Sequence, residues 1–127
     1  MTSDPTKCTV LYKILTPDEH AGLPTSDWKG TSLDLKDGFV HLSTSSQVPL
    51  TLERFFNKDF FPGDDLVLGF IPRSSIDVDD KLKFDESAHG DRFGHVYGTI
   101  DPSKDFVKEI KIARESDGKF LLPELDF

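Results

Sequence analysis

The segment DGFVHLSTSSQ, residues 37–47, combines the pattern of a β-strand with polar side chains at positions where packing would favour apolar ones. Successive side chains of a strand point to opposite faces, so Val40 and Leu42 share a core face while His41 and Ser43 share the other. A buried imidazole or hydroxyl needs a hydrogen-bond partner. This polar face therefore predicts either the floor of a ligand cleft or a set of structural hydrogen bonds.

The residues after this strand predict an amphipathic helix. Apolar side chains recur there at helical spacing, at Val48, Leu52, Phe55 and Phe56. Thr44 and Gln47 match a capping box, although Pro49 is tolerated only in a first turn and makes Ser45 or Ser46 an alternative N-cap. A strand that runs into a helix N-terminus favours a bound phosphate or carboxylate, and the alternative is that Thr44 and Gln47 only cap the helix.

The remaining apolar segments predict an α+β fold. Strands are expected at residues 8–15, 38–44, 65–72, 81–86 and 95–100, followed by a hairpin over 106–123 around Asp117-Gly118. Residues 65–72 lack alternation, which is typical of a central strand covered on both faces. Residues 16–38 are expected to be mostly loop, with one short helix after Thr16. We therefore expect one or more largely antiparallel sheets that form a cleft, with one main helix after the second strand.

The chain of 127 residues has no repeat or linker, which predicts a single domain over residues 1–127 with a flexible N-terminus at 1–7. Its 23 acidic and 15 basic residues give a net charge of −8, which opposes non-specific binding to nucleic acid or to an anionic membrane. The single cysteine, Cys8, fits a reducing compartment, and no apolar run is long enough to span a membrane. We therefore expect a cytoplasmic protein, with the nucleus as a compatible location.

A second segment, FGHVYG at residues 93–98, also carries a histidine on a strand. His95 and Tyr97 fall on one face of it, flanked by glycines that let a ligand or another chain come close. If the polar faces of the two strands meet, His41, Ser43, His95 and Tyr97 line one pocket that holds groups titrating near neutral pH. The alternative is that His95 and Tyr97 are half-buried sheet residues with satisfied polar tips.

Three further side chains are candidates for the same cleft. Glu86 is either a carboxylate base that partners an imidazole or a solvated strand end. Arg92 lies in a glycine-flanked loop and is placed to reach an anion. Trp28 is either a lid over the core or a ring that stacks on a ligand.

Motifs for metals and for three common enzyme classes are absent from the sequence. His89, Asp91 and His95 lie within seven residues, but their spacing matches no common zinc pattern and there is no second cysteine. The chain also has no GxxxxGK, GxGxxG or GxSxG motif. We therefore expect no bound metal, no certain cofactor, and no kinase, dinucleotide dehydrogenase or serine hydrolase.

Several motifs, taken in order, resemble the family known as domain of unknown function 952. They run over residues 11–123 and read YKIL, a single W, DGFVHLSTSSQV, RFF, DLVLGFI, LKFDE and FGHVYG. The family is grouped with the ADP-ribosyltransferase-like superfamily, so the resemblance implies two small antiparallel sheets around a cleft that binds or splits NAD. Ser43 and Thr44 then match the superfamily's middle catalytic motif, and Tyr12 and Trp28 are candidate ligand-binding residues.

The chain departs from that superfamily in two of three motifs. The first motif requires His or Arg on a strand that here reads Leu11-Tyr12-Lys13-Ile14. The third requires Glu on a late strand, where HVYGTI has none and Glu86 is only a loose substitute. These departures separate the chain from the usual ADP-ribosyl transfer and leave a nucleotide-related pocket as the implication.

Three functions remain open from the sequence. The first is an ADP-ribosyltransferase-like domain that binds, and cleaves or transfers, an NAD-related or phosphorylated small molecule. The second is a non-catalytic module that binds a metabolite or peptide, and the third is a His-assisted hydrolase or isomerase. The predicted catalytic residues are His41, Ser43 and Glu86, and the predicted ligand-binding residues are Thr44, His95, Tyr97, Arg92, Tyr12 and Trp28.

Overall fold

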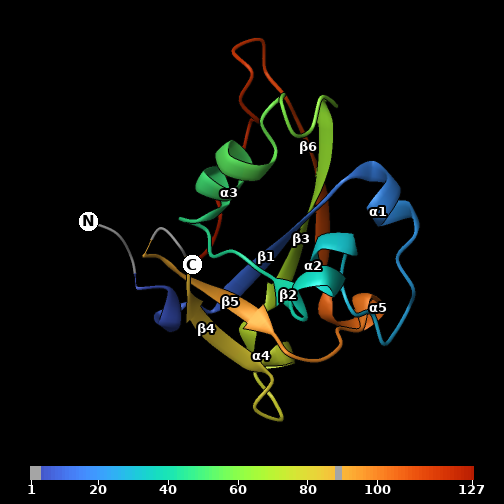
Figure 1. Cartoon of the computed structure of the whole chain (residues 1–127), viewed down its shortest axis with the longest axis vertical. Coiled ribbons are helices and arrows are strands. Elements are labelled where there is room, and N and C mark those ends of the chain that lie inside the picture. The colour runs from blue at the N-terminus through green and yellow to red at the C-terminus, as the bar shows by residue number, and fades with distance from the viewer. Residues whose placement is uncertain (1–3, 88–89) are drawn as a thin grey trace.

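The computed structural model of the chain describes residues 4–87 and 90–127 (Figure 1). Its strands are β1 (Val10–Leu15), β2 (Val40–His41), β3 (Asp65–Pro72), β4 (Leu82–Glu86), β5 (Arg92–Val96) and β6 (Lys108–Ala113). Its helices are a 3-10 helix η1 (Pro5–Lys7) and the α-helices α1 (Pro17–Ala21), α2 (Ser32–Asp37), α3 (Val48–Phe55), α4 (Arg73–Ile76) and α5 (Pro102–Asp105). The chain is therefore α+β, as its sequence predicts.

Two antiparallel sheets of three strands each form the scaffold, with the strand orders β1-β3-β6 and β2-β5-β4. The segment predicted as a central strand is β3, which lies between β1 and β6. The sheets are joined where Tyr12 of β1 pairs with Ser43, just after β2. Because Val40 and His41 pair with β5, the chain passes from one sheet to the other within a few residues.

The β1-β3-β6 sheet has a core on each of its faces. One core fills the space between the two sheets and includes Trp28, Ile100 and Phe106 together with side chains of β1 to β5. The other lies under α3, where Val48 and Leu52 pack against β1, β3 and β6. Figure 1 shows α3 and the β4–β5 pair separated by β1. This arrangement leaves β2 and β5 at the place where the two sheets meet.

β2 is shorter than the strand predicted at residues 38–44. It ends at His41, because Ser43 exchanges backbone hydrogen bonds with Tyr12 of β1, at 2.7 and 2.9 Å, and so leaves β5. The change of partner turns the chain between the two residues. The alternation that places His41 and Ser43 on one face therefore stops at His41.

β5 begins and ends earlier than the strand predicted at residues 95–100. It covers Arg92–Val96, and the chain then bends so that Ile100 exchanges backbone hydrogen bonds with Trp28. The closing hairpin forms only in part. Arg114 bridges Phe120 across a turn that contains Gly118 in the left-handed conformation, at φ +88°.

Several short helices occupy segments that the sequence pattern does not assign to helix. α2 lies within residues 16–38, α4 follows β3 and α5 precedes β6. α2 begins with a capping box, in which the side chains of Thr31 and Asp34 each accept from the other's backbone N–H. The short helix predicted after Thr16 is α1, and Thr16 is its N-cap.

α3 matches the predicted amphipathic helix in position but buries a narrower face. Its N-cap is Gln47, which makes no side-chain cap bond; instead its amide oxygen accepts from the backbone N–H of Thr44 in the preceding turn. Of the two hydrogen bonds of the predicted capping box, the one from the Thr44 backbone N–H to the Gln47 side chain is therefore present, and it lies one turn before the start of α3. Phe55, predicted on the buried face, is 56% exposed because the helix ends there, whereas Phe56 packs against the core.

The N-terminal segment predicted as flexible contains structure. Pro5–Lys7 form η1, whose N-cap Asp4 accepts from the backbone N–H of Thr6. Residues 1–3 lie outside the described residues. Within residues 4–87 and 90–127, no helix is both long and apolar enough to cross a membrane.

Candidate functional site

His41 and His95 lie directly opposite each other on β2 and β5. Opposite residues of an antiparallel pair point to the same face of the sheet. The two imidazole rings therefore meet, with their centroids 5.2 Å apart and their planes at 75°. The structure thus brings the two histidines together, as expected if the polar faces of the two strands meet.

A buried carboxylate, Asp34 of α2, holds the ring of His41. Its Oδ1 accepts from Nδ1 of His41 at 2.6 Å and from the backbone N–H of His41 at 3.1 Å. Its Oδ2 accepts from Nζ of Lys13 at 2.7 Å and from the backbone N–H of Thr31 at 2.9 Å. Asp34 is only 1% exposed, and these four donors satisfy its carboxylate without water.

Lys13 reaches this carboxylate from β1 through the space between the sheets. It shares one face of β1 with Leu11 and Leu15, which belong to the core between the sheets. Its side chain is 6% exposed, and Nζ also donates to the backbone carbonyl of His41 at 3.0 Å. Lys13 therefore ties β1 to α2 and β2, and it fixes the position of the carboxylate that orients His41.

Gly30 permits the close approach of Asp34. Its φ is +109°, and a Cβ at this position would lie 2.4 Å from Cβ of Asp34. Only glycine combines that backbone conformation with that amount of space. Gly30 and the capping Thr31 together place Asp34 against His41.

The protonation state of Asp34 follows from its neighbours. Burial raises the pKa of Asp34, but hydrogen bonds from His41 and Lys13 and the charge of Lys13 outweigh burial and hold this pKa well below its ordinary value. Asp34 is therefore ionised at neutral pH. On the other side of the ring, Nε2 of His41 lies 3.0 Å from Oδ2 of Asp37, the exposed last residue of α2. Only an imidazolium can donate to both carboxylates at once.

His95 has a carboxylate partner of its own on β4. Nδ1 of His95 lies 2.7 Å from Oδ2 of Asp85, and the Tyr97 hydroxyl donates to the same oxygen at 2.5 Å. Burial lowers the pKa of His95, although the hydrogen bond to Asp85 opposes this effect. Hydrogen bonds from Tyr97 and His95 lower the pKa of Asp85, which therefore stays ionised. Because Asp85 accepts from Nδ1–H, Nε2 of neutral His95 carries the lone pair, and no hydrogen bond joins it to a described residue.

Phe39 packs against both histidines. Its ring stacks on His95 with centroids 4.0 Å apart and planes at 23°, and its centroid lies 4.8 Å from that of His41. An aromatic ring at this position keeps water away from one side of the imidazoles, which strengthens their hydrogen bonds. The other side stays open, since the His41 side chain is 33% exposed and Tyr97 is 47% exposed.

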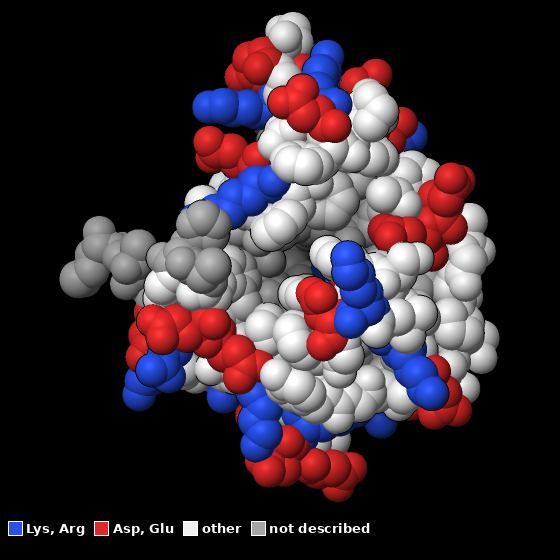
Figure 2. Space-filling model, viewed as in Figure 1, with Lys and Arg blue, Asp and Glu red and all other residues white. Residues whose placement is uncertain are grey.

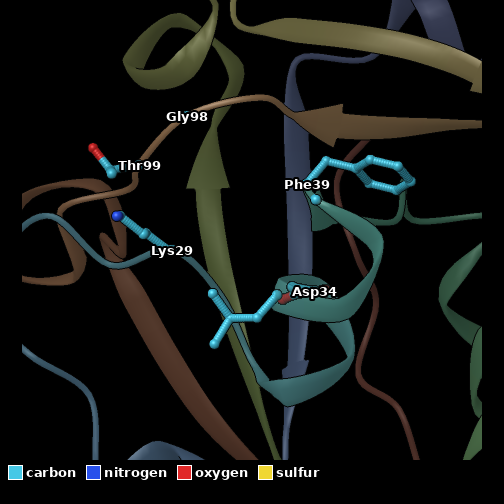
Figure 3. Close-up of a pocket in the computed structure, with 7 residues that line it drawn as sticks. Lys29, Asp34, Phe39, Gly98 and Thr99 are labelled. Carbon is cyan, nitrogen blue, oxygen red and sulfur yellow. The ribbon is translucent and has the colours of Figure 1, made fainter.

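An open cavity of about 280 Å³ adjoins the site (Figure 3). Asp34 and Phe39 line it together with Lys29, Leu35, Gly38, Gly98 and Thr99. Neither histidine lines this cavity, so it borders the imidazole pair without containing it. In Figure 2 this face of the molecule is hollowed near its centre, and basic side chains are scattered among acidic ones without forming a basic patch.

Ser43 and Thr44 lie in the protein interior, away from the imidazole pair. The Ser43 hydroxyl lies 2.9 Å from the Thr51 hydroxyl on α3, and Ser43 is 4% exposed. Thr44 is fully buried, and its hydroxyl lies 3.2 Å from that of Ser46. The structure therefore does not bring the predicted Ser43 and Thr44 to His41, because the chain changes sheets after His41.

Tyr12 and Trp28 also belong to the core. The Tyr12 hydroxyl donates to the backbone carbonyl of Asp126 at 2.7 Å, and its ring meets Phe70 edge-on in the core under α3. Trp28 is 9% exposed and meets Phe106 edge-on in the core between the sheets. Both rings are buried and do not face an open site. Trp28 thus covers the core, which is one of the two positions predicted for it.

Glu86 and Arg92 lie at the end of the β4–β5 pair, where they are paired across the strands and exposed. Side chains alternate along β4, so Glu86 points to the face opposite that of Asp85, which contacts His95. The carboxylate partner predicted at Glu86 is therefore one residue earlier, at Asp85. Arg92 contributes its backbone carbonyl, which accepts from Nε2 of Gln47 at 2.6 Å.

Five residues of the site are not among those predicted from the sequence: Lys13, Asp34, Asp37, Phe39 and Asp85. The alternation that places Leu82 and Phe84 inward also places Asp85 on the face of His95, and this signal selects it over Glu86. Asp34 has a local signal in its Thr-x-x-Asp capping pattern. No local pattern marks Lys13, because its partner Asp34 lies on another element.

No three His, Cys, Asp or Glu side chains of residues 4–87 and 90–127 are grouped so that they could hold a metal ion. Of the weak metal pattern noted in the sequence, His89 lies outside the described residues.

The family model described as Protein of unknown function (DUF952) matches residues 14–107 of the chain. The chain therefore belongs to this family. The crystal structure of protein CC0527 from Caulobacter crescentus is similar, with 30% sequence identity and a TM-score of 0.75, over 89% of this chain and 94% of that one. A double mutant of the same protein matches with a TM-score of 0.74 at the same identity and coverage. No curated protein matches the chain.

Proposed function

We propose that the protein is an acid–base enzyme that cleaves, or transfers a group from, an NAD-related or otherwise phosphorylated small molecule. The observation that carries this proposal is the pair of facing imidazoles, 5.2 Å apart, each held through Nδ1 by an aspartate. Two titratable groups whose surroundings differ can serve as a general acid and a general base.

His95 is the general base in this proposal. Its Nδ1–H is directed at Asp85, so Nε2 of this largely buried ring carries the lone pair, and in this proposal it takes a proton of the substrate or of an attacking water. Burial lowers the pKa of His95, which keeps the ring unprotonated at neutral pH. Asp85 and Tyr97 act as positioning residues that hold the tautomer and the ring.

His41 is the proton donor. Its ring lies between the carboxylates of Asp34 and Asp37, so the imidazolium form satisfies both contacts. Asp34 is fixed by Lys13, and this keeps Nδ1 of His41 occupied and directs Nε2 to the open side of the site. A leaving group that binds there takes its proton from Nε2.

The choice of ligand class rests on the resemblance to the ADP-ribosyltransferase-like superfamily. We propose that the two antiparallel sheets correspond to the ADP-ribosyltransferase-like architecture. Because a core fills the space between the sheets of this chain, we place the NAD-related molecule on the open side of the imidazole pair. The exposed part of Tyr97, beside Phe39, offers an aromatic surface for a planar ring. Since no late-strand glutamate occupies the site, the chemistry assigned to this chain depends on the histidines. We further propose a cytoplasmic location, because the only cysteine is unpaired and buried.

The test is a product assay with the full chain against NAD, ADP-ribose, nicotinamide and phosphorylated sugars. We expect turnover of at least one compound, reduced about 10²- to 10⁴-fold by His95→Gln. His20→Gln is the matched control, because His20 also pairs with a carboxylate, Glu109 at 2.7 Å, at a place away from the imidazole pair. A turnover that survives in His95→Gln contradicts the proposal.

A non-catalytic binding module is the second candidate, and one observation favours it. The 280 Å³ cavity borders Asp34 and Phe39 but excludes both histidines, so a ligand can lie beside the pair without meeting it. Binding of a compound in that cavity without any product would support this function. Lys29→Ala, which changes a residue of the cavity alone, would then weaken binding more than His95→Gln does.

A further inference from the structure

The contact between Asp37 and His41 differs from the other carboxylate contact of the same ring. Oδ2 of Asp37 lies 3.0 Å from Nε2 of His41, and the Asp37 side chain is 38% exposed. The contact on the opposite ring nitrogen, Nδ1, is to Asp34, which is 1% exposed. One carboxylate is therefore built into the protein, and the other lies at its surface.

Asp37 is not needed to hold the ring. The orientation of His41 is set by two hydrogen bonds to Oδ1 of Asp34, from the ring Nδ1 and from the backbone N–H. Phe39 contacts the ring from the side. Removal of the Asp37 carboxylate leaves all of these contacts in place.

Asp37 is not needed to shape its own loop either. The end of α2 is made by Gly38, which adopts the left-handed conformation at φ +89° and donates its backbone N–H to the carbonyl of Asp34. Within the described part of the chain, the Asp37 side chain makes no other ion pair or hydrogen bond than the one to His41. Rotation of its carboxylate into water breaks this single exposed contact.

We propose that Asp37 holds the place on Nε2 of His41 that an oxyanion of the ligand, a phosphate or a carboxylate oxygen, takes on binding. The ligand oxygen accepts the same N–H, and the displaced Asp37 carboxylate turns into solvent. This inference rests on the proposed function, because it places the ligand at the same histidines. It adds that the leaving group is itself this oxyanion, so that the N–H that binds it also gives up its proton on cleavage, and that Asp37 limits its affinity by competition and by charge repulsion.

The experiment measures dissociation constants of inorganic phosphate and of acetate for the full chain, from NMR shifts of the backbone amide of Gly38, which every variant retains. The variants are Asp37→Ala, which removes the competitor, and Asp37→Asn, which keeps a neutral acceptor. Two like charges about 4 Å apart in water repel by about 1 kcal/mol, so we expect Asp37→Ala to bind about fivefold more tightly. Asp37→Asn should be intermediate. Tighter binding of phosphate alone, or of acetate as well, identifies which oxyanion the site takes.

Two controls separate this effect from a general change of net charge. Asp59→Ala removes one exposed carboxylate after α3 and should leave both affinities unchanged. In a His41→Gln background, Asp37→Ala should give no gain. Unchanged or weaker anion binding in Asp37→Ala overturns the inference. A gain of affinity that persists in the His41→Gln background also overturns it, as does the failure of both anions to bind any variant.

The outcomes also separate this inference from the proposed function. If turnover depends on His95 but the anion affinities do not change when Asp37 is replaced, the inference is wrong and the proposed enzymatic function still stands. A His41-dependent gain of affinity in Asp37→Ala, with no turnover of any compound, supports the inference and favours a binding module over an enzyme.

Discussion

Replacement of Lys13 by Met should be among the most destabilising single changes in this protein. The variant removes Nζ from Asp34, 2.7 Å away, while both side chains are almost fully buried. The Asp34 carboxylate then keeps its contacts with His41 and Thr31 but loses its ion pair with a lysine. Breaking one partner of a buried ion pair costs about 3–5 kcal/mol, because the remaining charge stays out of water.

This loss is large compared with the stability of a small domain, which is about 5–15 kcal/mol. An unfolding entropy of about 2.1 cal/mol/K per residue gives about 0.27 kcal/mol/K for 127 residues. The expected fall in Tm for Lys13→Met is therefore roughly 10–20 °C. Calorimetry and urea unfolding at pH 7 measure it directly.

Lys83→Met is the matched control. Lys83 also lies close to an aspartate, Asp80 at 2.8 Å, but the two side chains are 45% and 89% exposed. An exposed pair contributes at most about 1 kcal/mol. A second variant, Asp34→Asn added to Lys13→Met, should restore part of the loss because no buried charge remains. If Lys13→Met is no more destabilising than Lys83→Met, then Lys13 does not support the site as described.

Three further predictions concern protonation and backbone. The folded-state pKa of Asp34 lies below its unfolded value of about 3.9, so the ionised carboxylate stabilises the folded state above that pH and this contribution is lost as the pH falls. The difference in urea midpoint between wild type and Asp34→Asn should therefore shrink below about pH 4. In an NMR titration, the pKa of His95 should lie below about 6.5, and Asp85→Asn should lower it further because the Asp85 hydrogen bond raises it; an unchanged pKa in that variant would argue against the pairing. Gly30→Ala should be more destabilising than Gly118→Ala by about 2 kcal/mol in denaturant unfolding, because both glycines have a positive φ but only at Gly30 would a Cβ clash with neighbouring atoms. Equal losses of stability would mean that the close approach of Asp34 does not require glycine at position 30.

Much of the fold follows from local sequence patterns. The apolar run at residues 65–72 marks the central strand, and the periodic apolar positions from Val48 mark α3, because burial on two faces or on one face leaves a direct periodicity. The N-cap at Thr16 is equally local. Once β2 and β5 are known to be neighbours, the alternation of side chains places His41 and His95 on the same face of the sheet.

The rest of the site depends on contacts that no local pattern encodes. Ser43 leaves the face of His41 because its backbone pairs with Tyr12, which lies far away in sequence. Lys13 is one polar residue in an apolar strand, and it meets Asp34 only because the fold places α2 beside β2, where the Lys13 side chain reaches it. Tertiary contacts of this kind, rather than propensity, decide which polar residues meet.

The most direct test of the central claim is an NMR titration of the imidazole signals with ADP-ribose. If the facing histidines form the ligand site, the His41 and His95 signals shift together and saturate, while those of His20, paired with Glu109 elsewhere, stay in place. Signals of His41 and His95 that do not move, or that move no more than those of His20, would contradict the account.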